Sequence, residues 1–194
     1  DAEEQVDAFG HVIPSDDRNV DGNLDEAELP TRAAPRSRVG ARPDREIERI
    51  VTLFVCARPG DMIAGPDLVV AAEKAGLVFG DQGIFHRMPP GKSELGPIFS
   101  MVNMIKPGHF DMTQVDTMAT PGVSFFMALP GPLSALDAWD AMLPTAQRLA
   151  ELLDANVLDE QRNTLGRQGI AHVRDELRAW DRKQESNQIR PWRT

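Results

Sequence analysis

Short blocks of apolar residues, many of them β-branched or aromatic, recur through the middle of the chain and predict β-strands. The segment RIVTLFVCA, residues 49–57, is apolar on both alternating faces. Further strands are predicted at 83–87, 97–105 and 122–129, between Gly- and Pro-containing turns. Residues 156–165 read as two short strands joined by a turn. The pattern therefore predicts about six strands.

Three segments have the apolar spacing of three and four residues that is typical of amphipathic helices. They cover residues 66–75, which begin with Pro66, residues 134–154 and residues 167–183. With the strands, they give the order β-α-β-β-β-α-β-β-α. We therefore expect an α+β fold, in which three helices cover one face of a six-stranded, mostly antiparallel sheet and leave the other face open.

Strand alternation divides the predicted sheet residues between these two faces. The more apolar set, exemplified by Val51, Phe99 and Phe125, belongs to the core. The opposite set is mixed, yet its members include the large apolar residues Ile50, Phe54, Val102, Met104 and Phe126. Exposed apolar patches of this kind usually mark a binding site. The alternative is that the N-terminal linker or the C-terminal tail folds back over this face.

Charge is distributed unevenly along the 194 residues, whose net charge is −9. Residues 1–29 hold ten acidic side chains and one basic one, so the remaining 165 residues are neutral. Residues 31–45 are basic, contain Pro and have few large apolar side chains. We therefore expect a disordered linker over 1–45, acidic and then basic, a folded domain over 46–184, and a frayed tail over 185–194.

Composition and motifs exclude several classes of protein. The single Cys cannot form an internal disulfide, and no stretch approaches the ~18 apolar residues of a membrane span. The four His residues lack metal-ligand spacing, so we expect no enzyme and no cofactor. The acidic segment does resemble a calcium-binding EF-hand loop, but Pro14 and Pro30 flank it. Its candidate oxygen ligands are Asp17, Asn19, Asp21, Asn23 and Glu28.

Four separated segments, in order, resemble the C-terminal domain of the bacterial cell-division protein ZipA. These are GLVFGDQGIFHR from Gly76, FSMVNMIKPGHFD from Phe99, TPGVSFFMALP from Thr120 and VLDEQR from Val157. The resemblance implies an adaptor with an N-terminal membrane helix that is absent from this chain and a C-terminal domain that binds the C-terminal peptide of FtsZ. Such a protein works at the division site, on the cytoplasmic face of the inner membrane, and stabilises the division ring.

The resemblance also implies which residues bind the FtsZ peptide. Most of them belong to the mixed face of the predicted sheet, opposite the core, whereas Gln82 and Phe85 come from the resemblance alone. The full set is Ile50, Thr52, Phe54, Gln82, Phe85, Val102, Met104, Lys106, Ser124 and Phe126.

A nucleic-acid platform is the alternative from another functional class, because a sheet displaying Phe54, Phe85 and Phe126 could stack the bases of single-stranded RNA. The zero net charge of residues 30–194 argues against it, since nucleic-acid-binding proteins depend on positively charged surfaces to bind phosphates. We therefore expect no nucleic acid among the partners.

Overall fold

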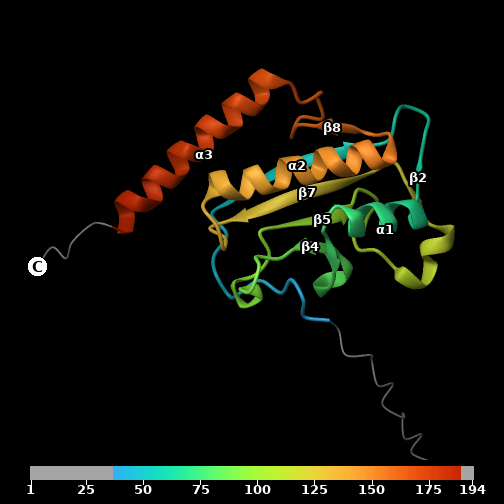
Figure 1. Cartoon of the computed structure of the whole chain (residues 1–194), viewed down its shortest axis with the longest axis horizontal. Helices are drawn as coiled ribbons and strands as arrows, with labels where there is room; N and C mark the ends of the chain where they lie inside the picture. Colours follow the sequence, from blue (N-terminus) through green and yellow to red (C-terminus); the bar gives the residue numbers. More distant parts are fainter. Residues whose placement is uncertain (1–36, 189–194) are drawn as a thin grey trace, which may run out of the picture. The chain divides into compact units, whose positions relative to one another are not determined.

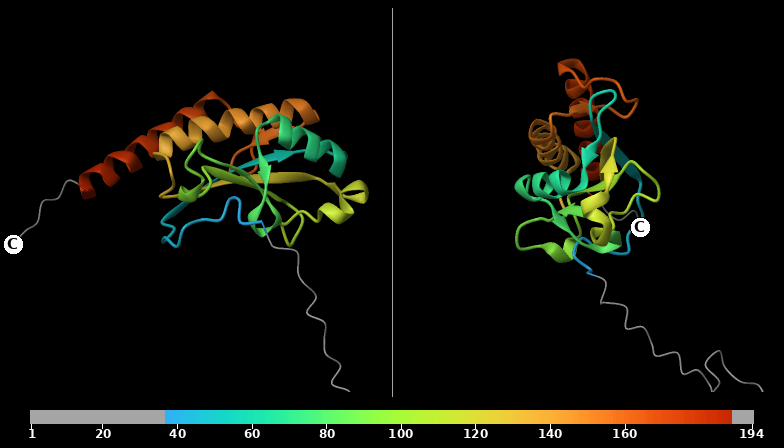
Figure 2. Two further views of the ribbon diagram at one scale, coloured as in Figure 1. Left: turned by 60° about the horizontal axis from the view of Figure 1, so that its bottom comes forward. Right: turned by 90° about the vertical axis from the view of Figure 1, so that its right-hand side faces the viewer.

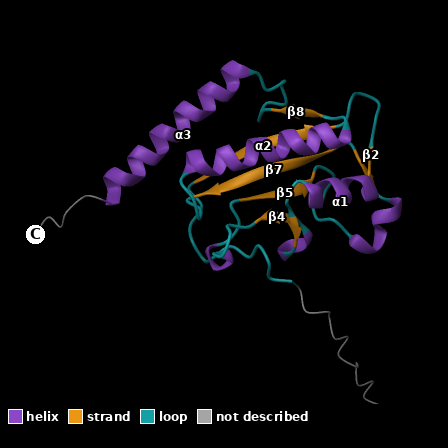
Figure 3. Cartoon of the chain, viewed as in Figure 1, coloured by secondary structure: helices purple, strands orange, loops and turns teal. Residues whose placement is uncertain are grey.

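A six-stranded antiparallel sheet organises residues 37–188, which are the residues that the computed structural model describes (Figure 1 and Figure 3). Its strand order is β3-β4-β5-β7-β1-β8. A separate two-stranded sheet pairs β2 with β6. The strand bounds are β1 Arg49–Cys56, β2 Ile63–Ala64, β3 Val78–Phe79, β4 Phe85–Arg87, β5 Phe99–Asn103, β6 Ala119–Thr120, β7 Gly122–Leu129 and β8 Asn156–Leu158.

Within residues 37–188, three α-helices build the core together with the sheet. They are α1 Gly65–Lys74, α2 Ala135–Leu153 and α3 Arg167–Gln188. Figure 2 shows α1 and α2 on one side of the sheet, while the start of the described chain, in blue, runs along the other side. Trp139 of α2 and Leu68 of α1 are buried against core-facing strand residues such as Leu53 and Phe125. Three 3₁₀ turns complete the fold, at Asp81–Gly83, Ser93–Leu95 and Met112–Thr117. The expected α+β class is confirmed.

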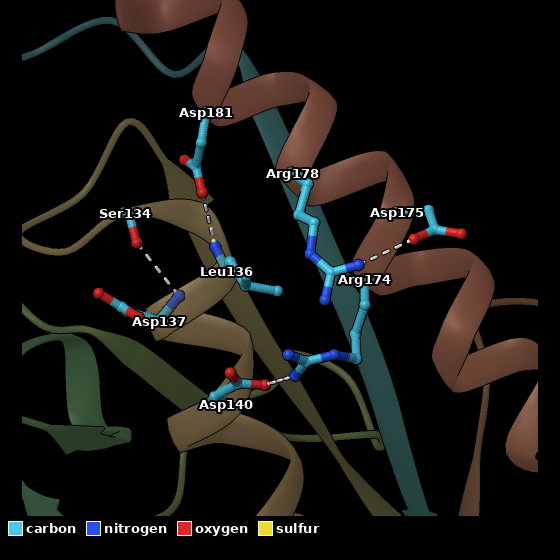
Figure 4. A network of polar contacts seen from close by, with 8 residues as sticks. All are labelled: Ser134, Leu136, Asp137, Asp140, Arg174, Asp175, Arg178 and Asp181. Atoms are coloured by element: carbon cyan, nitrogen blue, oxygen red, sulfur yellow. Dashed lines mark hydrogen bonds and ion pairs between the residues drawn. The ribbon is translucent and has the colours of Figure 1, made fainter.

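Polar contacts join helix α3 to the N-terminal part of α2, and Figure 4 draws those made by Leu136 and Asp140 of α2. Both carboxylate oxygens of Asp181 accept main-chain N–H groups of α2, from Ala135 at 2.8 Å and from Leu136 at 3.0 Å. The hydroxyl of Ser134 accepts a further N–H in this part of α2. Arg174 forms an ion pair with Asp140 of α2. A carboxylate from another helix thus satisfies donors that every helix N-terminus leaves free.

Three sequence predictions about elements need correction. The sixth strand of the sheet is β3, whereas the second half of 156–165 contributes only the single bridge Leu158↔Thr164. The last helix continues to Gln188, so residues 185–188 are helical where a frayed tail was expected. Residues 37–45, expected to belong to a disordered linker, form hydrogen bonds with the domain. The rest of the predicted linker and the calcium-loop candidates lie outside the described residues.

Candidate functional site

The face of the sheet opposite the helices carries most of the predicted site residues. Register places Thr52 beside Phe126, and it places both Phe54 and Val102 beside Ser124. Ile50 is 52% exposed, and most of the others are partly exposed. We call this surface the open face and define it by residues of β1, the β5 segment and β7: Ile50, Thr52, Phe54, Val102, Met104, Ser124 and Phe126.

Lys106 and Gln82 lie at the margins of the open face. Lys106 follows β5 in an exposed turn. Gln82 is exposed in the 3₁₀ turn before β4, with a left-handed φ of 59°. It lines a hollow that Phe126 also lines. Both positions are compatible with contact to a ligand on the open face.

Phe85 does not lie on the open face, and the expectation for this residue is wrong. Only 1% of it is exposed, and its ring packs edge-on against Phe79 and Phe110, at 5.4 Å in each case. The physical reason is register: Phe85 pairs with the fully buried Met101, and cross-strand partners share a face. The open face therefore displays two of the three phenylalanines on which the nucleic-acid alternative depends.

The turn after β8 covers one end of the open face, which the sequence did not indicate. The guanidinium of Arg162 lies over the ring of Phe54, 5.0 Å from its centroid, as in a cation–π contact. The Glu160 carboxylate accepts the main-chain N–H of Thr52 at 3.2 Å. The segment VLDEQR supported the family resemblance, but nothing in its spacing places Arg162 over a specific ring.

Residues 37–47, here called the strap, cross the other end of the open face. The Val39 carbonyl accepts the N–H of Asp81 at 2.6 Å. The guanidinium of Arg42 donates to the carbonyls of Ala128 at 3.2 Å and Pro130 at 2.7 Å. The alternative that the linker folds back over this face thus applies to residues 37–45, at the end formed by β4 and the start of β5.

Under the strap, His86 and Ser100 are buried, with exposed fractions of 3% and 2%. Burial lowers the pKa of the His86 imidazole and outweighs the opposite effect of Asp81. The Asp81 carbonyl lies 2.9 Å from Nε2 and can only accept, so Nε2 carries the proton. Nδ1 then accepts from the Ser100 hydroxyl at 2.7 Å. His86 is a neutral, fully hydrogen-bonded group of the fold.

Cys56 is at the far end of β1 from the strap, beside Met104, with 3.6 Å between their sulfur atoms. Burial raises the pKa of its thiol against the opposing charge of Arg162, which disfavours the reactive thiolate. Within residues 37–188, no three His, Cys, Asp or Glu side chains are grouped as a metal site requires. What the open face offers is apolar contact area with polar margins, which is the chemistry of binding.

Comparison with known proteins agrees with the resemblance seen in the sequence. A family model described as "ZipA, C-terminal FtsZ-binding domain" matches residues 49–176. The Cell division protein ZipA of Xanthomonas campestris pv. campestris (strain 8004) is 51% identical over 182 residues, which are 93% of this chain and 74% of that protein. In the described part of the chain, none of the helices is both long and apolar enough to span a membrane.

Two further relatives carry the same name. The ZipA of Xanthomonas euvesicatoria pv. vesicatoria (strain 85-10) is 55% identical over 154 residues, 79% of this chain and 63% of that protein. The ZipA of Xylella fastidiosa (strain Temecula1 / ATCC 700964) is 56% identical over 147 residues, 76% of this chain and 60% of that protein. The similarity thus extends well beyond the four segments that first suggested it.

Proposed function

Since the chain belongs to the ZipA family, through its C-terminal FtsZ-binding domain, we propose that its open face binds the C-terminal peptide of FtsZ. The family makes it a cell-division adaptor rather than an enzyme. We further propose that it tethers FtsZ polymers to the inner membrane, through a membrane helix N-terminal to this sequence. Bound there, it stabilises the division ring.

The observation that carries this proposal is the apolar strip along the open face. Phe54, Val102, Met104 and Phe126 are all partly exposed. They belong to three neighbouring strand segments, on the side of the sheet away from α1 and α2 (Figure 2). Large, partly exposed aromatic and Met side chains are the residue types that most often anchor a partner. The strip is therefore better suited to a partner's apolar side chains than to water.

An amphipathic peptide, partly extended and partly helical, fits such a strip by laying its apolar side across it. The cations at the margins, Lys106 and the Arg162 guanidinium over Phe54, favour a carboxylate on the peptide's polar side. A single peptide contact of this size gives modest affinity. Many copies tethered to one membrane would strengthen the attachment of an FtsZ polymer by avidity.

Calorimetric titration with a synthetic FtsZ C-terminal peptide tests the proposal. Phe126→Ala removes a central anchor and is expected to weaken binding by on the order of 2 kcal/mol, whereas Lys106→Ala at the rim should cost less than ~1 kcal/mol. Val70→Ala is the matched control, because Val70 is an equally apolar residue, 50% exposed, on α1. Binding that is absent, or that is indifferent to Phe126, would contradict the proposal.

A further inference from the structure

The strap and the open face enclose a hollow of about 210 Å³. Phe126 and Gln82 line it, and both also belong to the proposed peptide site. The strap contributes Gly40, Arg42 and Ile47 to its wall. Because it shares Phe126 with the apolar strip, the hollow is continuous with the open face.

The strap packs closely against the domain at defined contacts and is therefore part of the fold. Three glycines allow its close approach: a Cβ on Gly40 would collide with the His86 ring, one on Gly80 with the Val39 carbonyl, and one on Gly96 with Pro43. Gly40 and Gly96 also have left-handed φ angles, of 87° and 86°. Since the Arg42 bonds described above fix the middle of the strap, the wall of the hollow has a defined position.

Most polar groups around the hollow are already paired, which determines what it can hold. Both ring nitrogens of His86 are hydrogen-bonded, to Ser100 and to the Asp81 carbonyl. Both terminal nitrogens of Arg42 donate to main-chain carbonyls, whereas its buried Nε has no hydrogen-bond partner among the described residues. The remaining lining is largely apolar: Ile47, Ile84, Pro97, Phe99, Phe126 and Ala128. An incoming group is therefore offered apolar contact.

We infer that this hollow is a specificity pocket for one apolar side chain of the FtsZ peptide, with the strap as one of its walls. The inference rests on the proposed function and extends it to residues 37–47, which precede the matched region at 49–176. Its volume lies below the ~300–1,000 Å³ of pockets that hold drug-sized ligands, which fits a single side chain. Gln82, within the 3₁₀ turn that borders the hollow, has an amide to offer the peptide main chain.

Two variants of the whole chain test the pocket by calorimetry with the synthetic FtsZ peptide. Ala128→Leu fills the hollow and should weaken binding about tenfold, the effect of closing a site that an anchor side chain occupies. Its matched control is Ala119→Leu, an exposed strand alanine in the separate β2–β6 sheet, which should leave the affinity unchanged.

Arg42→Ala is the second variant, and it releases the strap from Ala128 and Pro130 without adding bulk. It should weaken binding about fivefold, since loss of one wall removes part of a side chain's contacts. Arg148→Ala, at an exposed position of α2 on the other side of the sheet and identical in charge change, is its control. In addition, the NMR signal of the Gly40 main-chain amide in the unmutated chain should shift as peptide is added. The dissociation constant from this titration should equal the one from calorimetry.

The outcomes separate this inference from the proposed function. If Phe126→Ala weakens binding while both pocket variants behave like their controls and the Gly40 signal stays fixed, the pocket is not used although the open face is. If Arg42→Ala tightens binding, the strap competes with the peptide, which also overturns the inference. If the unmutated chain binds no peptide, the proposed function fails and the pocket fails with it.

Discussion

The two phenylalanines of the open face have different surroundings, and this difference gives the face a direction. Phe54 lies under the Arg162 guanidinium, whereas Phe126 borders the hollow beneath the strap. One end of the face thus presents a guanidinium, with the Glu160 carboxylate nearby on Thr52, and the other is recessed and apolar. A peptide with an acidic residue at one end and a large apolar residue at the other would be bound in a single orientation.

We expect His86 to make the stability of the domain sensitive to pH. Burial lowers the pKa of its imidazole below the ordinary 6.5, so the unfolded chain binds this proton more readily than the folded one. The contribution of neutral His86 is therefore complete above the ordinary pKa and declines as the pH falls through it. We expect the free energy of unfolding to decrease on acidification to about pH 5.5.

Urea unfolding at about pH 7.5 and about pH 5.5 measures this effect. His86→Gln is the comparison variant, because an amide can still donate to the Asp81 carbonyl and accept from Ser100 but does not titrate. The variant should lose less stability on acidification than the unmutated chain. Equal losses in both would mean that protonation of His86 does not oppose folding.

At the scale of elements, the sequence predicted the sheet and its two faces because strand alternation is a local signal. It assigned Ile50, Thr52 and Phe54 to the side away from Val51 and Leu53, and the register confirms that assignment. Phe85 was misplaced because it was transferred from the family resemblance. Its strand, β4, has only three residues, so its orientation depends on pairing with β5 rather than on a pattern of its own.

The strap could not be predicted, because nothing in its composition favours order. Residues 37–47 bury little apolar surface. Hydrogen bonds of main-chain carbonyls and of one guanidinium hold them in place, and three glycines leave the room for their close approach. Each of those partners is distant in the sequence: Arg42 and Ala128 are separated by 86 positions. A local reading of hydrophobicity therefore assigns most of the strap, residues 37–45, to the linker.

Asp181 makes the attachment of α3 to α2 testable. Asp181→Ala removes the acceptor for the N–H groups of Ala135 and Leu136, and the loss of a helix N-cap typically costs ~1 kcal/mol. Urea unfolding should show this loss, and the open face, on the other side of the sheet, should keep its affinity for the peptide. Asp175→Ala is the control, since its exposed pair with Arg178 lies within α3 and is worth less than ~0.5 kcal/mol. Equal effects of the two substitutions would show that Asp181 does not act as a cap.

For the whole molecule, the net charge of −9 belongs to the first 29 residues, which lie outside the described structure. The described residues 37–188 hold 16 basic and 20 acidic side chains, a modest net charge of −4, so long-range attraction contributes little to the choice of partner. Under the proposed function, recognition is expected to depend on shape and apolar contact on the open face. This agrees with a family whose matched domain is described as FtsZ-binding.

The most direct test of this account is an NMR titration of the whole chain with a synthetic FtsZ C-terminal peptide, following the main-chain amide signals. The account predicts that the shifted signals come from β1, from β5 through Lys106, from β7 and from the strap, with those of α1 and the exposed side of α3 unchanged. Shifts confined to the helices would contradict it. So would the absence of shifts at peptide concentrations well above the dissociation constant measured by calorimetry.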